Sequence, residues 1–282
     1  MRIRSNGSTG YISCEVGEYN LYEQLFQIKN LTKSFGGLIA VNDLSFDLEE
    51  DGIHALIGPN GSGKTTAINL ISGVLAPDKG SILFCGKELV GVPPHKISTA
   101  GLRRTYQNIK LFGSMTLMEN VMVGAHSLTT AGLVRTAFDF KKRRSEEKML
   151  RDLAMEMLDR IGLYERRNEL AKSQPYGIQK ILELAVAIIT EPKMLILDEP
   201  AAGLNPTERS EFIDMLLKIY HEMNLKILLV EHNMDIIMNL SKKITVINFG
   251  IKIAEGTPQD IQNNSEVIEA YLGKNYKRVY QL

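Results

Sequence analysis

Tryptophan is absent from this sequence of 282 residues, cysteine occurs only twice, and neither sign of charge is in excess. Cys14 and Cys85 do not have the spacing of metal ligands and predict no disulfide framework, which suits a reducing compartment. Lys and Arg together number 33, as do Asp and Glu, so the formal net charge is zero. That balance argues against a protein that coats nucleic acid, although it could conceal a local basic patch.

Long hydrophobic runs are also lacking. None approaches the roughly 20 apolar residues that a membrane-spanning helix needs, and residues 1–20 do not contain the apolar segment of a signal peptide. Contact with a membrane is therefore expected to go through a partner. The length suits one or two domains with ample core. Residues 1–23 are polar and dotted with glycine, and we expect a flexible extension there, ahead of a fold that begins near Leu25.

The central motif is the run Gly-Pro-Asn-Gly-Ser-Gly-Lys-Thr-Thr at residues 58–66, which fits the phosphate-binding loop of nucleoside triphosphatases. A short apolar strand is expected before it and a helix at its end. Glycines let backbone N–H groups turn inward onto phosphate oxygens, and the helix N-terminus favours the same anion. Lys64 would reach the β- and γ-phosphates, and the Thr65 hydroxyl would hold Mg²⁺. The candidate nucleotide ligands are Gly58, Pro59, Asn60, Gly61, Ser62, Gly63, Lys64, Thr65 and Thr66.

A second chemical signal is a pair of acids, Asp198 and Glu199, at the end of an apolar strand expected at 193–197. Unpaired carboxylates avoid a core, so their position needs a reason. They could simply cap the strand. Beside a phosphate-binding loop we favour a functional interpretation, in which Asp198 supports Mg²⁺ and Glu199 polarises the attacking water.

Three further side chains have both a structural and a functional interpretation. Gln107 ends an expected strand, where glutamine is usually solvated, but its amide oxygen could ligate Mg²⁺ or orient a water. His232 follows a strand expected at 226–230 and is either structural or a stabiliser of charge at the γ-phosphate. Phe35 is either a core anchor or a platform on which adenine stacks.

The rest of the pattern predicts a mainly helical segment at 113–190. Apolar residues recur with a helical period after Ser145, which we expect to cap that helix. The basic run Lys141–Arg144 could be a nucleic-acid patch, but a solvated helix entry explains it as well. A hairpin is expected at 244–254, with a turn at Asn248-Phe249-Gly250.

Taken together and in this order, the motifs resemble those of an ATP-binding cassette of the ABC transporters, over residues 25–273. The resemblance implies an α/β fold of the P-loop NTPase class, with a RecA-like core, an N-terminal antiparallel β subdomain and a helical subdomain. The core is expected at 24–112 and 191–256, the helical subdomain at 113–190, and C-terminal helices and a tail at 257–282.

The resemblance also implies a role for each motif. Phe35 matches the aromatic that stacks on adenine, and Gln107 matches the glutamine that faces the transmembrane partner. Glu199 matches the catalytic acid, His232 the switch histidine, and residues 202–205 the loop that contacts the second cassette of a dimer. In that loop Asn205 stands where many relatives have Asp.

Residues 174–180 match the signature loop, in which Tyr176, Gly177 and Gln179 are expected to bind the nucleotide of the other cassette. The general signature is Leu-Ser-Gly-Gly-Gln. Here Pro175 replaces the Ser and Tyr176 the first Gly, and proline offers neither a hydroxyl nor an N–H donor. This departure suggests two unequal ATP sites in a heterodimer.

Within the family, three stretches resemble the LivG-type cassettes of branched-chain amino-acid importers: 104–109, 199–206 and 267–273. That resemblance implies ATP and Mg²⁺ as cofactors. It implies transmembrane permease subunits and a second cassette, identical or not, as direct partners, and a solute-binding protein as an indirect one, with no nucleic acid. The place implied is the cytoplasmic face of the plasma membrane, at its periphery.

Three alternatives stay open. The first is a cassette for another solute, such as a different amino acid, an amide or urea, or for lipopolysaccharide export. The second is a soluble ABC-type protein of translation or DNA repair, for which the segment 113–173 is too short and lacks heptads. The third is a regulatory module that does not hydrolyse ATP, against which Lys64, Glu199 and His232 argue.

Overall fold

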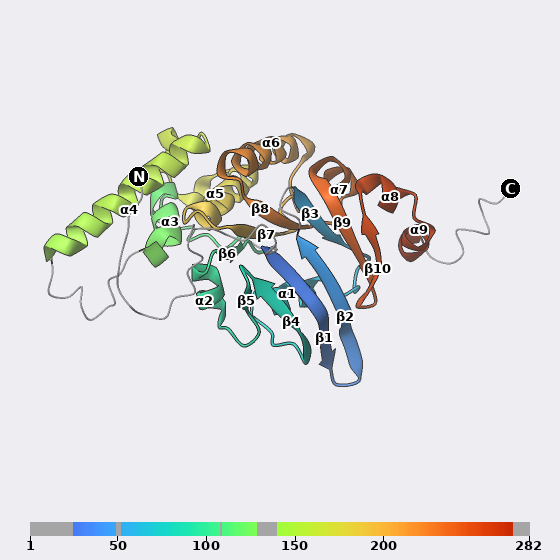
Figure 1. Cartoon of the computed structure of the whole chain (residues 1–282). Coiled ribbons are helices and arrows are strands. Elements are labelled where there is room, and N and C mark those ends of the chain that lie inside the picture. The colour runs from blue at the N-terminus through green and yellow to red at the C-terminus, as the bar shows by residue number, and fades with distance from the viewer. Residues whose placement is uncertain (1–24, 49–51, 108, 129–139, 273–282) are drawn as a thin grey trace.

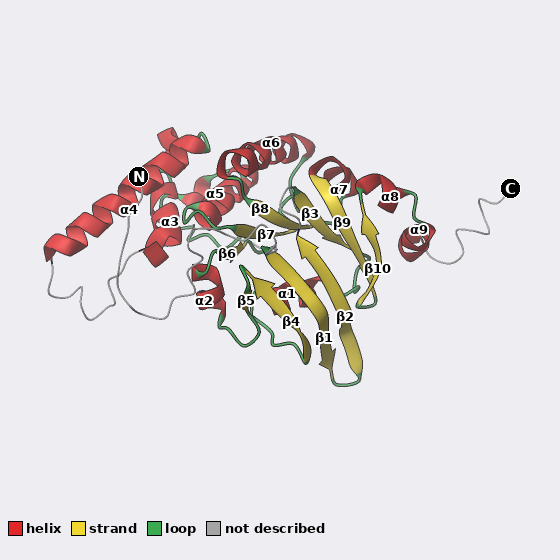
Figure 2. Ribbon diagram, viewed as in Figure 1, coloured by secondary structure: helices red, strands yellow, loops and turns green. Residues whose placement is uncertain are grey.

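The computed structural model describes residues 25–48, 52–107, 109–128 and 140–272, apart from the side chains of 140–143. The expected N-terminal extension and the C-terminal tail lie outside these ranges. Within them the chain forms two sheets and surrounding helices (Figures 1 and 2). The antiparallel sheet has the strand order β2 (Leu38–Leu48), β1 (Phe26–Phe35), β4 (Lys79–Phe84), β5 (Lys87–Glu88).

The second sheet has the order β10 (Ile251–Gly256), β9 (Ser241–Asn248), β3 (Ile53–Ile57), β8 (Lys226–Val230), β7 (Met194–Asp198), β6 (Leu102–Arg104). All neighbours in it are parallel except β9 and β10. The helices are α1 (Lys64–Ile71), α2 (Pro94–Thr99), α3 (Leu117–Gly124), α4 (Phe140–Arg160), α5 (Tyr176–Ile188), α6 (Pro206–Met223), α7 (Met234–Leu240), α8 (Pro258–Gln262) and α9 (Ser265–Leu272).

The parallel sheet is covered on both faces, and its strands β3 and β7 are accordingly mainly apolar. Every residue of β3 and β7 is buried. Because successive side chains of a strand point to opposite faces, Leu195 and Leu197 pack against the layer of helices α3–α6, whereas Met194 and Ile196 pack on the other side. Such two-sided burial is typical of parallel sheets, and it fixes the ends of β3 and β7, where the candidate site residues begin.

Helix α1 belongs to the core between the two sheets. Its residues Ala67, Ile68 and Ile71 are fully buried and share one cluster with Phe26 of the antiparallel sheet and Leu228 of the parallel sheet. A helix held on both sides in this way keeps its N-terminus, which follows the phosphate-binding loop, in a fixed place.

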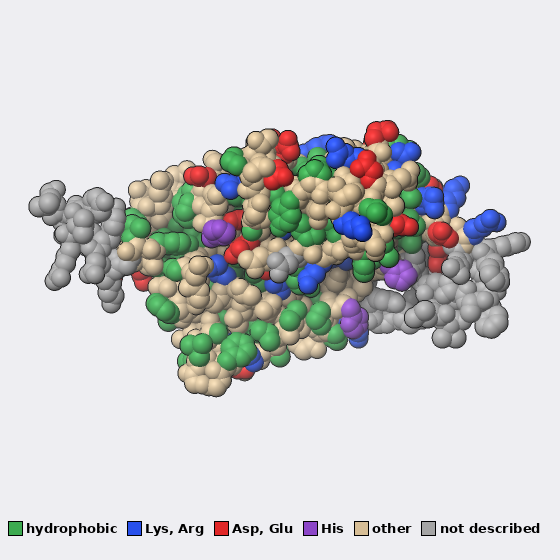
Figure 3. All heavy atoms as spheres, turned by 180° about the vertical axis from the view of Figure 1, so that it is seen from behind, with side chains coloured by type: hydrophobic (Ala, Val, Ile, Leu, Met, Phe, Trp, Pro, Cys, Tyr) green, Lys and Arg blue, Asp and Glu red, His purple; other side chains and the backbone are tan. Residues whose placement is uncertain are grey.

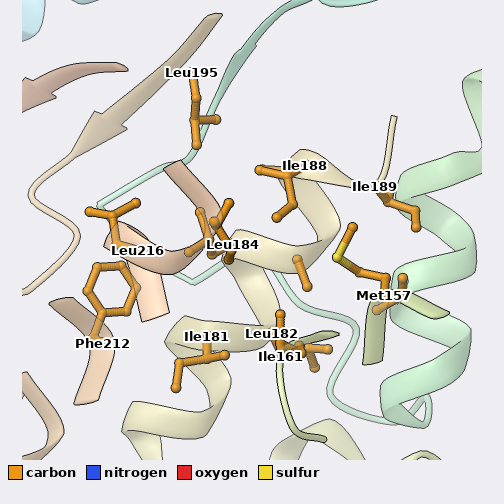
Figure 4. Close-up of a cluster of buried hydrophobic side chains, with 14 of the residues drawn as sticks. Met157, Ile161, Ile181, Leu182, Leu184, Ile188, Ile189, Leu195, Phe212 and Leu216 are labelled. Carbon is orange, nitrogen blue, oxygen red and sulfur yellow. The ribbon is translucent and has the colours of Figure 1, made fainter. Parts of the chain in front are cut away.

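The other face of the parallel sheet carries the predicted helical segment. Figure 4 shows side chains of α4, α5 and α6 meeting there, among them Met157, Leu184 and Leu216, with Leu195 of the sheet beside them. The helical period read after residue 145 is confirmed, since Ala154, Met157 and other residues of that face lie in this core.

The fold class predicted from the sequence is confirmed, with corrections in detail. The strand expected at 25–28 extends to Phe35, because β1 pairs with β2 along its length. The expectation that Ser145 caps a helix is wrong: α4 begins at Phe140, so Ser145 lies inside it and the basic run occupies its first turns. Cys85 is disulfide-bonded, so the expectation of no disulfide is wrong for this residue.

A buried histidine makes the stability of the fold depend on pH. His54 of β3 contacts the Thr245 hydroxyl through Nε2 at 2.9 Å. Burial, and then the charge of Lys243, lower its pKa from 6.5 to about 4. Between these two pH values, His54 therefore binds a proton in the unfolded chain but stays neutral in the folded chain. We expect the free energy of unfolding to be intact above pH 6.5 and to lose about 3 kcal/mol from this group as pH falls to 4.

Urea unfolding of the wild type and of His54→Gln, measured between pH 7 and pH 4, tests this expectation. The glutamine keeps a polar partner for Thr245 but does not titrate, so the variant should lose less stability in acid. His95→Gln, at an exposed position, should keep the wild-type pH profile. Parallel profiles for all three proteins would contradict the assignment to His54.

Candidate nucleotide-binding site

The phosphate-binding loop connects β3 to α1, as its sequence predicts. The backbone turns where Ser62 N–H donates to Pro59 O at 3.1 Å. Gly63 then precedes α1 with φ 104°, and a Cβ at this position would lie 2.4 Å from Ala40 O. Only glycine fits there. No side chain caps α1, so its first N–H groups are free to meet an anion.

Lys64 lies inside this loop rather than in solvent. Only 8% of the residue is exposed, and Nζ donates to Gly58 O at 2.7 Å and to Pro59 O at 3.0 Å. Burial lowers its pKa, while the negative charges of Glu199 and Asp198 act in the opposite direction. The Ser62 hydroxyl is buried without a hydrogen-bond partner among the described residues. These donors therefore fit a phosphate group, which would supply an acceptor for the Ser62 hydroxyl and a further one for Lys64 Nζ.

A cavity of about 380 Å³ opens above the loop. It is lined by residues 60–66, by Glu199, and by an apolar group at the ends of two hairpins: Phe35, Leu38, Ile39, Ala40 and Phe249. Phe35, predicted as a stacking platform, is 46% exposed and faces this space. Phe249 is 80% exposed and was predicted only as part of a turn. The cavity thus pairs phosphate donors with an apolar wall, as a nucleotide requires.

Three predicted residues converge at the mouth of this loop. Gln107 Nε2 donates to Glu199 Oε2 at 2.7 Å. His232 Nδ1 lies 3.7 Å from Glu199 Oε1. Glu199 itself has φ 48°, a left-handed conformation that costs energy in a residue with a side chain. The strain is held by its N–H bond to Val230 O at 2.8 Å, which joins the ends of β7 and β8 and aims the carboxylate toward the cavity.

Asp198, the other predicted acid, ends β7 and is 8% exposed. Among the residues that the structure describes, no three His, Cys, Asp or Glu side chains come together as a metal site. A metal here would depend instead on the Asp198 carboxylate, the Thr65 hydroxyl, the amide oxygen of Gln107 and phosphate oxygens. Such all-oxygen sets suit Mg²⁺, which usually takes few protein ligands.

The predicted signature residues are not in this cavity. Helix α5 begins at Tyr176, with Pro175 before it. Gly177 N–H donates to Glu208 Oε1 at 3.3 Å, and Gln179 Nε2 donates to Gln174 O at 2.9 Å. None of these residues lines the space around the phosphate loop, so within one chain the two halves of the expected site are separate.

Comparison with known proteins supports the same interpretation. Residues 41–202 match the family described as ABC transporter, and residues 252–277 match the one described as branched-chain amino acid ATP-binding cassette transporter. The high-affinity branched-chain amino acid transport ATP-binding protein LivG of Salmonella typhimurium is 41% identical over 252 residues, which cover 89% of this chain and 99% of LivG. The chain belongs to the ATP-binding cassettes of the ABC transporters. It is an ATP-hydrolysing subunit of such a transporter.

Two further relatives agree. BraF of Pseudomonas aeruginosa, named as a high-affinity branched-chain amino acid transport ATP-binding protein, is 40% identical over 89% of this chain and 98% of its own length. The crystal structure of an ABC-transporter cassette in its ADP conformation superposes with a TM-score of 0.77 at 28% identity, covering 89% of this chain and all of that one. The fold and the nucleotide binding of the cassette are thus established.

Four site residues of the cassette escape the sequence patterns: Arg104, Lys180, Glu231 and Phe249. Lys180 is 2% exposed and donates to Gln107 O at 3.1 Å, so it connects α5 to the loop that contains Gln107. Glu231 is 1% exposed and accepts backbone N–H bonds from Ala201 and His232. The signal in the sequence for Lys180 and Glu231 is a charged residue at the edge of an apolar run.

The C-terminal part of the cassette also reaches the phosphate loop. Val267 of α9 shares a core cluster with Ile57, the residue before Gly58. Burial raises the pKa of Tyr271 to about 12, and the nearby backbone of Gly58 opposes that shift. The described part of the segment matched by the branched-chain family, up to Leu272, therefore packs against the base of the loop.

Across residues 25–272, where described, no helix of the cassette is both long and apolar enough to cross a membrane. The face in Figure 3 shows basic and acidic side chains interspersed, with no broad field of one sign. The side chains of Lys141–Arg143 from the predicted basic run lie outside the described residues.

Proposed function

We propose that this cassette hydrolyses ATP to drive an importer of branched-chain amino acids, at the cytoplasmic periphery of the membrane. The observation that carries the hydrolytic part is the convergence of Gln107, Glu199 and His232 beside the phosphate loop. The solute is supported by relatives of about 40% identity that match over nearly their whole length, and by the C-terminal segment.

The roles proposed for the side chains follow from their places. Lys64 and the N–H groups of the loop bind the β- and γ-phosphates, and Phe35 stacks on the base. Glu199 accepts a hydrogen bond from the attacking water and aligns it, while His232 donates to oxygens of the γ-phosphate as charge develops there. Thr65, Asp198 and Gln107 would hold Mg²⁺, which when bound neutralises phosphate charge.

We propose that a second cassette completes each ATP site. Tyr176, Gly177 and Gln179 do not line this chain's own cavity, but they could cover the nucleotide of a partner. ATP bound by both chains favours the closed pair, and its hydrolysis reopens them. Because Pro175 lacks the donors of a serine, the site that this chain covers is expected to be the weaker of two unequal sites.

A second groove, of about 280 Å³, is proposed to receive a helix of the permease. It lies between the core and the helical segment, which we propose forms the subdomain 113–190, and its lining includes Tyr106, Lys110 and Glu183. Burial raises the pKa of Glu183, and Lys180 nearby opposes that shift. The groove adjoins the Gln107 loop, so a movement of the permease helix could reach the catalytic residues.

The solute is tested by purifying the cassette together with the permeases and the second cassette that we propose as its partners. In vesicles, leucine with the matching solute-binding protein should stimulate ATP hydrolysis and be taken up, whereas an amide or urea should not. Stimulation by a different solute would replace the proposed one. Co-purification of a lipid-exporting permease, or stimulation by ribosomes or DNA, would overturn the importer assignment.

A further inference from the structure

We infer that Arg104 is the positioning residue for Asp198, and that it sets the affinity of the site for a divalent cation. The inference rests on the proposed metal role of Asp198. Arg104 follows Arg103 in a short strand and was predicted only as part of a family-like stretch. The structure places its side chain against the acid at the end of the neighbouring strand.

The guanidinium of Arg104 is almost fully enclosed, since 8% of the side chain is exposed. Nη2 donates to Asp198 Oδ2 at 2.8 Å. Nη1 donates to Asn69 Oδ1 at 2.8 Å and to Ser72 Oγ at 3.2 Å, and both of these residues are at the end of the phosphate-loop helix. One planar group therefore joins β6, β7 and α1 in a geometry that a lysine ammonium does not reproduce.

This arrangement constrains one oxygen of Asp198 and leaves the other unclaimed by arginine. Strands β6 and β7 are parallel, with Arg104 opposite Ile196, so the arginine reaches forward two residues to the carboxylate. With Oδ2 held, the carboxyl group cannot rotate freely, and Oδ1 keeps a fixed direction. A partner of this kind usually tunes the metal affinity of the ligand that it holds.

Tyr106 closes the arrangement on the side of the permease groove. Its ring lies 5.1 Å from the Arg104 guanidinium carbon. Enclosure keeps water away from the ion pair, so salt should screen it little. A buried ion pair is weak evidence for stability, because desolvation offsets its attraction. Asp198, the acid of this pair, directly precedes Glu199, the proposed catalytic residue. This position points instead to a role of the ion pair in orienting a ligand.

The test uses Arg104→Lys, which keeps the charge but loses the fork, and Arg103→Lys as the matched control. Arg103 is the preceding residue and donates to Ser127 Oγ instead. Binding of a fluorescent ATP analogue is measured in EDTA and then along a Mg²⁺ titration, with urea unfolding of each variant alongside.

For Arg104→Lys we expect the affinity for the ATP analogue in EDTA to stay within about twofold of the wild-type value. The Mg²⁺ concentration that gives half of the Mg²⁺-dependent change in binding should rise about tenfold or more. Arg103→Lys should match the wild type in its affinity in EDTA and in its Mg²⁺ dependence. A purely structural role would lower the unfolding midpoint without moving the Mg²⁺ dependence, and this outcome overturns the inference.

The same titration separates failure of the inference from failure of the proposed site. If binding to the wild type did not depend on Mg²⁺, the metal role of Asp198 would be wrong and the inference would fall with it. If the wild type depends on Mg²⁺ and Arg104→Lys shows the same dependence, only the role of Arg104 is wrong. When Mn²⁺ replaces Mg²⁺, the variants should keep the same order in the cation concentration that they need for binding.

Discussion

Replacing Glu199 with glutamine is expected to stop ATP turnover while ATP is still bound, and so to trap closed pairs of cassettes. Glutamine has nearly the shape of glutamate, and its carbonyl oxygen can still accept the bond from Gln107 Nε2. It has no negative charge with which to polarise a water. Phosphate release should fall about 10²- to 10⁴-fold, the usual range for a general base, and ATP affinity should be retained.

The trapped pair is measured by size-exclusion chromatography with light scattering, in ATP and in ADP, with the second cassette present. Glu211→Gln is the matched control, because Glu211 is exposed on α6 and the same chemical change is made outside the cavity. Its turnover and its assembly should equal those of the wild type. Unchanged phosphate release in Glu199→Gln would discard Glu199 as the base.

The parts of this cassette that could be predicted from sequence are those encoded over a few residues. The loop at 58–66 needs glycines at fixed positions, so its sequence specifies its conformation. The helix caps are equally local: Thr116 and Glu119 form a capping box, with Glu119 N–H donating to the Thr116 hydroxyl at 3.2 Å and Thr116 N–H to Glu119 Oε2 at 2.8 Å. The pair Asn205 and Glu208 does the same for α6.

The parts that could not be predicted depend on pairings between distant segments. Arg104 meets Asp198 across 94 residues, and nothing near either residue specifies that β6 lies beside β7. The convergence of Gln107 on Glu199 spans 92 residues; it was expected only because the family resemblance supplied the arrangement. The start of α4 was predicted wrongly at Ser145, whereas the helix begins at Phe140. A serine before an apolar face is a capping signal, but the same residue is also tolerated inside a longer helix.

Replacing Lys64 with alanine is expected to remove most of the affinity for ATP and all detectable hydrolysis. Nζ is enclosed beside Gly58 O and Pro59 O, and Asp198 and Glu199 lie near enough to influence its charge. Without Lys64 the phosphates would meet those two acids with less compensating positive charge. ATP affinity should fall about a hundredfold. The affinity for ADP should fall less, because ADP has no γ-phosphate for the Lys64 ammonium to bind.

The difference between the two nucleotides makes this prediction specific to the phosphate site. Titration calorimetry with ATP and ADP measures it, and Lys148→Ala, an exposed lysine on α4, should leave both affinities unchanged. A general loss of folding would weaken the binding of ATP and ADP equally, and it would also lower the midpoint of urea unfolding. If Lys64→Ala bound ATP as tightly as the wild type, the loop would not be the phosphate site, and the roles assigned to Thr65 and Glu199, which depend on where the γ-phosphate lies, would lose their foundation.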